Sequence, residues 1–450
     1  MRVVVEMMAC KSIRLRFCIT CFLIMPLCVA LQSGTQVFQD LGEQNKEFQR
    51  LALQKRNKMT IQAFRGVVAD TMLDDCALKV LYKLYRLPCE NKQIFSLTGC
   101  FKYNATPLYK LEDGQYVPLS LDETPELQSR FMDVTGIKPL LHGIELTTAL
   151  DEHWSLFKHK TMPTGKNINK KYSSYLITVV RASYERYGSI PIIAYHMANP
   201  YSPVPPERVG AYQNYVDRKH KNVVGEMRQR TGESCGYRKE YNIPRDYLDA
   251  KLDALSEFIK QLTDKNGHPI PCIIRPFHEM DMNSFWWGVD YCSAEDYKWL
   301  FRYTKDRVSK DVGTHSLIWG FSLGSRFKTR KAMLERYPGD EYVDIIGSNE
   351  YNVGSSSVVT KESLTRCMLT TQVCFERNKI ACLFESGVTG NDDLLNQGFY
   401  SLHYPSLVNH EGVYLSFFIE HGPSYAIPST EEGKKALRKF ARSKKIKKDW

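Results

Sequence analysis

Short apolar runs alternate with longer amphipathic segments along most of this 450-residue chain. In the segment 247–262, five apolar residues recur at helical spacing and form one face. Eight of the apolar runs have the length of buried strands. They are 94–98, 140–146, 192–197, 272–278, 316–319, 343–346, 380–385 and 413–418. Strand–helix alternation in this number predicts an α/β protein with a parallel (β/α)8 TIM barrel.

The two ends of the chain differ from its middle. Residues 1–30 combine a basic start with an apolar run that ends at Ala30, which is the pattern of a secretory signal peptide. An uncleaved anchor is the alternative, although the run is shorter than the ~20 residues a membrane span needs. Residues 31–75 are polar with scattered apolar positions and predict an N-terminal helical extension or a flexible leader. The barrel is expected over 76–433, followed by a basic tail at 434–450.

Charge is concentrated in the same two ends. The net charge of the whole chain is +11, of which residues 434–450 carry nine Lys or Arg and one Asp. A nucleic-acid-binding protein would spread basic side chains over a folded face with reading motifs, so no nucleic-acid partner is expected. The tail is either a solvated helix end or a weak binder of anionic surfaces. No segment after the signal is long and apolar enough for a stable membrane span.

The cysteines and one sequon carry expectations that follow from secretion. Four of the 13 cysteines leave with residues 1–30, and the nine that remain are an odd number. An oxidising route allows disulfides, and Cys89 and Cys100 flank the first predicted strand closely enough to bridge. Cys272 and Cys382 lie within strands and are expected to be buried thiols. Asn104 opens an N-x-T sequon and is expected to be glycosylated.

The predicted strand at 272–278 ends in residues that can carry chemistry. His278 and Glu279 follow its apolar core, where barrel enzymes place catalytic groups. Three aromatic residues come next, Phe285, Trp286 and Trp287. Their flat apolar faces suit stacking on sugar rings, although adjacent Trp residues are also typical of a core. A zinc motif H-E-x-x-H fails because Met282 replaces the second His, so no metal is expected.

A second carboxylate, Glu385, ends another apolar run, and it lies 106 residues after Glu279. At roughly 30–40 residues per βα unit, this gap spans about three units. Both glutamates would then face the same barrel mouth, after strands four and seven. Retaining glycosidases need two carboxylates about 5–5.5 Å apart. A competing pattern, G-x-S-x-G at 320–324, would instead make Ser322 an esterase nucleophile.

Five segments, in this order, resemble glycoside hydrolase family 26, whose commonest members are endo-β-1,4-mannanases. They read Y-H-M-A-N-P at 195–200, R-P-F-H-E-M at 275–280, F-W-W-G at 285–288, Y-P-G-D-E-Y-V-D-I-I-G at 337–347 and F-E-S-G at 384–387. The resemblance runs over roughly 75–445. It implies a double displacement in which Glu279 is the general acid/base and Glu385 the nucleophile.

The predicted substrate-binding residues combine this resemblance with the aromatic cluster. They are His196, Asn199, Arg275, His278, Phe285, Trp286, Trp287 and Tyr351. No cofactor is implied. The chain departs from the family pattern at several sugar-facing places, which leaves the substrate open. Ser284 and Tyr195 stand where the family has Trp, Asn349 stands where it has Asp, and Phe417 and Phe418 stand where a Trp is common.

These observations predict a secreted, extracellular endo-β-glycanase that hydrolyses β-1,4-mannosidic linkages in mannan-type polysaccharides. Its partner would be that polysaccharide. One alternative is another β-glycan specificity of the same family, for β-1,3-xylan or mixed-linkage β-glucan. A second alternative, from a different class, is a catalytically silent carbohydrate-binding barrel. The presence of both glutamates argues against silence, and the Ser284 replacement keeps it open.

Overall fold

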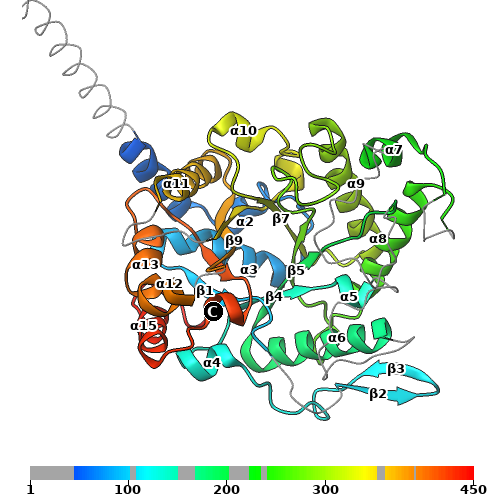
Figure 1. The fold of residues 1–450 in the computed structure, drawn as a ribbon, viewed down its shortest axis with the longest axis horizontal. Coiled ribbons are helices and arrows are strands. Elements are labelled where there is room, and N and C mark those ends of the chain that lie inside the picture. The colour runs from blue at the N-terminus through cyan, green and yellow to red at the C-terminus, as the bar shows by residue number, and fades with distance from the viewer. Residues whose placement is uncertain are drawn as a thin grey trace, which may run out of the picture. The chain divides into compact units, whose positions relative to one another are not determined.

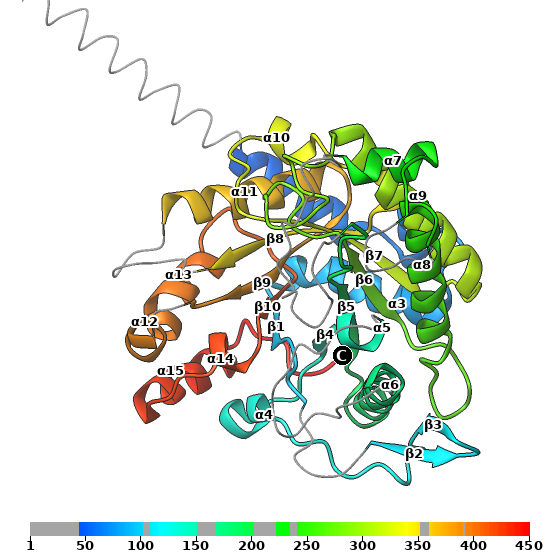
Figure 2. The same cartoon turned by 45° about the vertical axis from the view of Figure 1, so that its right-hand side comes forward.

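Figures 1 and 2 show the chain as a computed structural model, which describes residues 45–101, 108–150, 168–201, 222–234, 241–351, 360–389 and 392–450. By its internal contacts the chain divides into two units, 1–55 and 56–450. Residues 45–55 of the first unit are helical. The predicted signal peptide at 1–30 and the Asn104 sequon lie outside the described residues.

Eight parallel strands form a barrel in the second unit, which confirms the predicted fold (Figure 1). They are β1 (Ile94–Leu97), β4 (Leu141–Glu145), β5 (Ile190–Tyr195), β6 (Cys272–Pro276), β7 (Leu317–Leu323), β8 (Ile345–Tyr351), β9 (Ile380–Gly387) and β10 (Phe417–Glu420). The order β1-β10-β9-β8-β7-β6-β5-β4 closes through a parallel bridge between Thr98 and Gly143. A Cβ at Gly143 would lie 2.3 Å from Thr98 Oγ1, so only glycine permits this approach.

Helices surround the barrel, and a β-hairpin, β2 (Tyr109–Glu112) with β3 (Gln115–Pro118), projects beside α6 (Figure 1). The helices are α2 (Ile61–Arg65), α3 (Asp75–Arg86), α4 (Arg130–Thr135), α5 (Thr147–Leu150), α6 (Ile168–Tyr187), α7 (Val223–Gln229), α8 (Pro244–Lys260), α9 (Ala294–Val312), α10 (Arg330–Leu334), α11 (Lys361–Glu376), α12 (Asp392–Gln397), α13 (Tyr404–Val408), α14 (Pro423–Ala426) and α15 (Glu431–Ala441). The Ser293 hydroxyl caps α9 by accepting from the Asp296 amide at 3.1 Å.

Each barrel strand is apolar on both faces because both faces are buried. In β6, Ile273 belongs to an inner cluster that fills the barrel, whereas Cys272 and Ile274 belong to an outer cluster between sheet and helices. Gly347 on β8 makes room inside the barrel for the Phe384 ring, since a Cβ there would approach that ring to 2.7 Å. The filled interior leaves the strand ends as the place for polar side chains.

Residues 56–74 cover the end of the barrel where the strands begin. Phe64 and Leu73 join the inner cluster. The buried carboxylate of Asp344, just before β8, accepts from the Ala69 amide at 2.7 Å. Arg56 is 2% exposed, and its guanidinium donates to the Cys374 carbonyl at 2.9 Å. The part of the expected N-terminal extension that follows Lys55 is therefore integral to the barrel.

The C-terminal residues also belong to the barrel. Helix α15 crosses the boundary expected at residue 433, and it buries Leu437 and Phe440 in the outer cluster. Beyond the helix, Ile446 forms a parallel bridge with Gln93, and the Trp450 indole donates to the Gly188 carbonyl at 2.6 Å. Residues 434–450 therefore do not form a separate tail; their apolar positions pack while their basic side chains face outward.

The cysteine expectations are met in part. Cys272 and Cys382 are buried thiols, as expected. Cys100 is also a buried free thiol, so the Cys89–Cys100 disulfide expected from the sequence does not form in this structure. Within the described ranges, none of the helices combines the length and the apolar character that crossing a membrane requires.

Glu420, at the end of β10, gives a testable consequence for stability. Its carboxyl group is fully buried beside Tyr404 and Ser386, and burial raises its pKa to about 8. A raised carboxyl pKa favours the folded state below the unfolded pKa, and that contribution is lost as pH rises toward 8. We expect Glu420→Gln to gain stability relative to wild type by a few kcal/mol between pH 5 and pH 8.5. Urea unfolding at the two pH values measures this, and parallel pH dependences of both proteins would contradict it.

Candidate active site

The end of β6 departs from regular strand geometry. Phe277 and Glu279 adopt positive φ angles of 47° and 56°. The backbone therefore turns sharply after Pro276, and the Glu279 amide donates to the Ser322 carbonyl at 2.9 Å. A left-handed non-glycine residue costs about 1–3 kcal/mol and is typical of functional sites. The turn allows adjacent residues, His278 and Glu279, to serve the same region, which strict alternation would forbid.

A β-bulge does the same for the second glutamate. The pairing of β8 with β9 runs from Ser348–Leu383 to Asn349–Glu385 and skips Phe384. Phe384 belongs to the inner cluster, so ideal alternation would send the next side chain outward. The bulge instead brings Glu385 to the same side as Phe384. Its carboxylate is then close enough to receive a hydrogen bond from Arg275 of β6.

Three groups hold Glu385 in its ionised form. Arg275 donates to its Oε1, and the Tyr351 hydroxyl donates to its Oε2 at 2.6 Å. His421 Nδ1 lies 3.4 Å from the same Oε2. Burial alone would raise the pKa of Glu385, but the Arg275 charge, followed by His421, holds that pKa well below its usual range. Glu385 is therefore an anion across the physiological pH range.

Glu279 has the opposite electrostatic environment. Its burial and the negative charge of Glu385 raise its pKa to about 7. Asn349 donates to its Oε1 at 2.7 Å, which opposes this shift without cancelling it. Two neighbouring carboxyl groups whose pKa values are driven apart are the arrangement that separates an acid from a nucleophile.

A histidine pair lies beside the carboxylates. His196 Nδ1 contacts Glu145 Oε2 at 2.6 Å, and its ring lies 4.5 Å from that of His278, nearly perpendicular. Burial would lower the pKa of His196, but Glu145 raises it overall. Burial, with the charge of Arg275, lowers the pKa of His278 well below its usual value. The pair therefore presents one cation-prone ring and one neutral ring.

The aromatic residues after Glu279 are core residues, contrary to the expectation that they stack on sugar. Trp286 and Trp287 are 1% and 0% exposed. Their indole N–H groups donate to the carbonyls of Met197 and His278, at 2.9 and 2.8 Å. Phe285 stacks on Trp287 with ring centroids 4.6 Å apart. The cluster therefore supports the backbone of the site from behind instead of presenting a free face.

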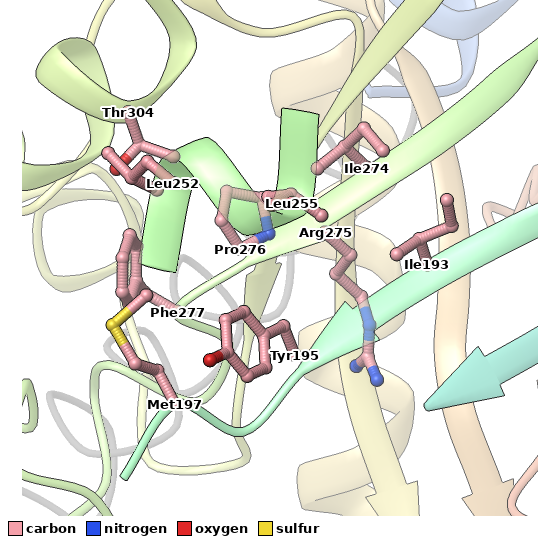
Figure 3. A pocket seen from close by; sticks show the side chains of 10 residues that line it. All are labelled: Ile193, Tyr195, Met197, Leu252, Leu255, Ile274, Arg275, Pro276, Phe277 and Thr304. Atoms are coloured by element: carbon pink, nitrogen blue, oxygen red, sulfur yellow. The ribbon is translucent and has the colours of Figure 1, made fainter. Parts of the chain in front are cut away.

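Of the remaining predicted residues, Asn199 is also fully buried, and its Oδ1 accepts from the Tyr201 amide at 2.9 Å. It shapes the turn after β5. Figure 3 shows Arg275 extending away from the apolar side chains of a small cavity behind β5 and β6. That cavity holds about 20 Å³, room for a single water, so it is not a substrate site.

Sequence reasoning missed three residues of the site. His421 contacts Glu385, Glu145 contacts His196, and Tyr425 packs against His421. The rings of Tyr351, His421 and Tyr425 all contact one another, with centroids 5.3 to 6.4 Å apart, and all three are partly exposed. Two adjacent polar residues, Glu420 and His421, after the apolar run of the last strand were the available signal for His421. This aromatic wall beside Glu385 replaces the one expected from the Trp pair.

The esterase pattern has no support in the structure. Ser322 lies inside β7 and is 0% exposed, whereas a nucleophile elbow needs an exposed Ser on a strand-to-helix turn. Its hydroxyl accepts from Arg275 at 3.2 Å and so serves the glutamate site. Among the described residues, no group of three or more His, Cys, Asp or Glu side chains is arranged to hold a metal ion.

Comparison with known proteins gives sequence relatives of one kind. Residues 159–366 match the profile of "Glycosyl hydrolase family 26". A mannan endo-1,4-beta-mannosidase of Bifidobacterium adolescentis is 31% identical over 156 residues, which is 34% of this chain and 16% of that protein. One of Bacillus subtilis is 26% identical over 248 residues, 53% of this chain and 57% of that protein. The chain thus spans less than two thirds of these relatives.

Solved structures extend the likeness in fold over most of the chain. GH26C from Muricauda sp. has a TM-score of 0.67 at 20% identity, covering 87% of this chain and 96% of its own. A GH26 beta-mannanase from Bacteroides ovatus has a TM-score of 0.62 at 21% identity, covering 83% and 94%. The barrel, the motifs in order and the profile match over residues 159–366 make this chain similar to the mannanases of glycoside hydrolase family 26.

Proposed function

We propose that this protein is a glycoside hydrolase that cleaves β-1,4-mannosidic linkages within mannan-type polysaccharides, with retention of configuration. The observation that carries the proposal is the pair of opposed carboxyl groups. Glu385 is held as an anion, while Glu279 keeps a proton to about pH 7. The mannan endo-1,4-beta-mannosidase relatives support the substrate class.

The first step uses both groups at once. Glu385 attacks the anomeric carbon, and Glu279 gives its proton to the departing glycosidic oxygen. The C–O bond to the leaving sugar breaks as the glycosyl–Glu385 ester forms. Arg275 and Tyr351 each donate to Glu385, so they align the carboxylate before attack and stabilise it when it is released again.

In the second step, Glu279 has lost its proton and takes one from a water molecule, whose oxygen attacks the anomeric carbon; the bond from that carbon to Glu385 breaks and the carboxylate is freed. The charge of Glu385 also affects Glu279 in this step. Once Glu385 is esterified, its negative charge disappears, and the pKa of Glu279 falls toward its ordinary value. The same residue thereby changes from acid to base as the intermediate forms.

The walls of the site give roles to the other side chains. We assign sugar contacts to His196 and His278 on one side and to Tyr351, His421 and Tyr425 on the other. His278 is neutral and His196 tends to be protonated, so they offer different hydrogen-bonding patterns to sugar hydroxyls. The partly exposed rings beside Glu385 offer the apolar surface on which a pyranose can pack.

Secretion, glycosylation at Asn104 and weak anionic-surface binding by 434–450 complete the proposal. The basic start and apolar run of residues 1–30 support export. Lys435, Arg438 and Lys439 line one groove with Tyr400 and Phe440, and this supports a basic outer face. Glu431 pairs with Lys434 and Arg438 there, which weakens that face.

Reducing-end release from mannan, glucomannan, β-1,3-xylan and mixed-linkage β-glucan tests the activity. We expect wild type to cut mannan, and Glu279→Gln and Glu385→Ala each to lose several orders of magnitude, because each removes one of two indispensable groups. Asn396→Asp, on the outer surface, is the control. Cleavage of another glycan alone would change the substrate. Binding of a glycan without cleavage would indicate a catalytically silent carbohydrate-binding protein.

The pH profile tests the charge assignment. Activity should fall above about pH 7, where Glu279 loses its proton, and should persist well below pH 4.5, where Glu385 stays ionised. Tyr351→Phe removes a hydrogen bond that favours the Glu385 anion, so its acid limb should move to higher pH by about one unit. The alkaline limb serves as the internal reference. Movement of both limbs together would oppose this assignment.

A further inference from the structure

Asn349 is buried between the two catalytic glutamates, at a place where the family pattern has Asp. It is 2% exposed. Its Nδ2 donates to Glu279 Oε1 at 2.7 Å, and its Oδ1 lies 3.5 Å from a guanidinium nitrogen of Arg275. Arg275 donates in turn to Glu385. A continuous path of hydrogen bonds therefore joins the two carboxyl groups through one amide and one guanidinium.

The polarity of this path is set by Arg275. A guanidinium can only donate, so it faces the oxygen of the Asn349 amide and leaves the NH2 group for Glu279. The Ser322 hydroxyl, 3.4 Å from the same Oδ1, supports that orientation. The amide cannot turn over without placing its NH2 group against the guanidinium. Its donor is thus fixed on Oε1 of Glu279.

A fixed donor determines where the proton of Glu279 sits. A neutral carboxyl group has one hydroxyl oxygen and one oxygen that mainly accepts. Since Oε1 accepts from Asn349, the proton resides on Oε2. We propose that Asn349 is a positioning residue that assigns the catalytic proton to Oε2 of Glu279 and couples this acid to the nucleophile through Arg275. This inference rests on the proposed function.

Aspartate at this position would act differently. The charged and titratable groups around Glu279 include Glu385 from β9, Arg275 from β6, Tyr351 from β8 and Asp281 from its own loop. A carboxylate at 349 would remove the donor and add a further negative charge beside Glu279, so the two would share a proton. It would also compete with Glu385 for Arg275. The amide therefore restrains the basicity of Glu279 in this chain.

Substrates whose leaving groups differ in acidity can show whether Asn349 positions the catalytic acid or only supports the structure. Mannan requires protonation of the leaving oxygen, whereas a 2,4-dinitrophenyl β-mannobioside does not. We expect Asn349→Ala to lose about 10–100-fold in kcat on mannan, with KM nearly unchanged. The first turnover of the dinitrophenyl substrate should stay within about 3-fold of wild type. Asn396→Asp, whose side chain caps the turn at Ser429, is the matched control for Asn349→Asp.

Two outcomes would overturn the proposal. One is an equal loss by Asn349→Ala on both substrates, which indicates a structural defect. The other is no loss on mannan. A measurement independent of turnover is the 13C NMR titration of the Glu279 carboxyl group, assigned with Glu279→Gln. Asn349→Asp should move its midpoint up by about one unit or more, and an unmoved midpoint would refute the coupling. If the Glu279 titration midpoint moves but the wild-type protein does not cut mannan, the proposed function is wrong and the inference about Asn349 stands.

Discussion

The buried guanidinium of Arg275 is the constraint on which the site depends. It is 4% exposed, and a cation in that position is tolerated only because Glu385 lies against it. The ion pair lowers the pKa of one glutamate, and the retained negative charge then raises that of the other. The buried Arg275–Glu385 ion pair therefore keeps Glu385 ionised and helps to keep Glu279 protonated. The apolar barrel below supplies the low-dielectric surroundings that make these shifts large.

Local breaks in strand geometry are the second requirement. Period-two alternation places Ile273 and Arg275 on the inner face of β6, and it cannot place both His278 and Glu279 there. Positive φ angles at Phe277 and Glu279 resolve this conflict on β6, and the bulge at Phe384 resolves it on β9. Trp287 holds the strained turn in place by donating to the His278 carbonyl, and Trp286 donates to the Met197 carbonyl after β5.

Features set by neighbouring residues could be predicted from the sequence, and features set by contacts between distant segments could not. The eight strands were found because burial on both faces leaves an unbroken apolar run, and Glu279 and Glu385 were found because each ends such a run. The sequence did not show that Trp286 and Trp287 are buried, because tertiary packing decides which side chains of a loop point toward the core. The contacts of His421, Glu145 and Asn349 join side chains that are far apart in the sequence. The pattern of residues along the chain does not reveal such partners. The packing of 434–450 was missed because its apolar residues are spread among many lysines.

The closure of the barrel has a consequence for the order of events during synthesis. The first strand, β1, lies between β4 and the last strand, β10, and Gln93, just before β1, bridges to Ile446. The pairing of β1 with β10 can therefore form only after residues 417–420 have left the ribosome. Until then, β1 and β9 both lack β10 as a neighbour, and contacts of such long sequence separation form slowly. A barrel built this way stays open along one side until its last strand has been made.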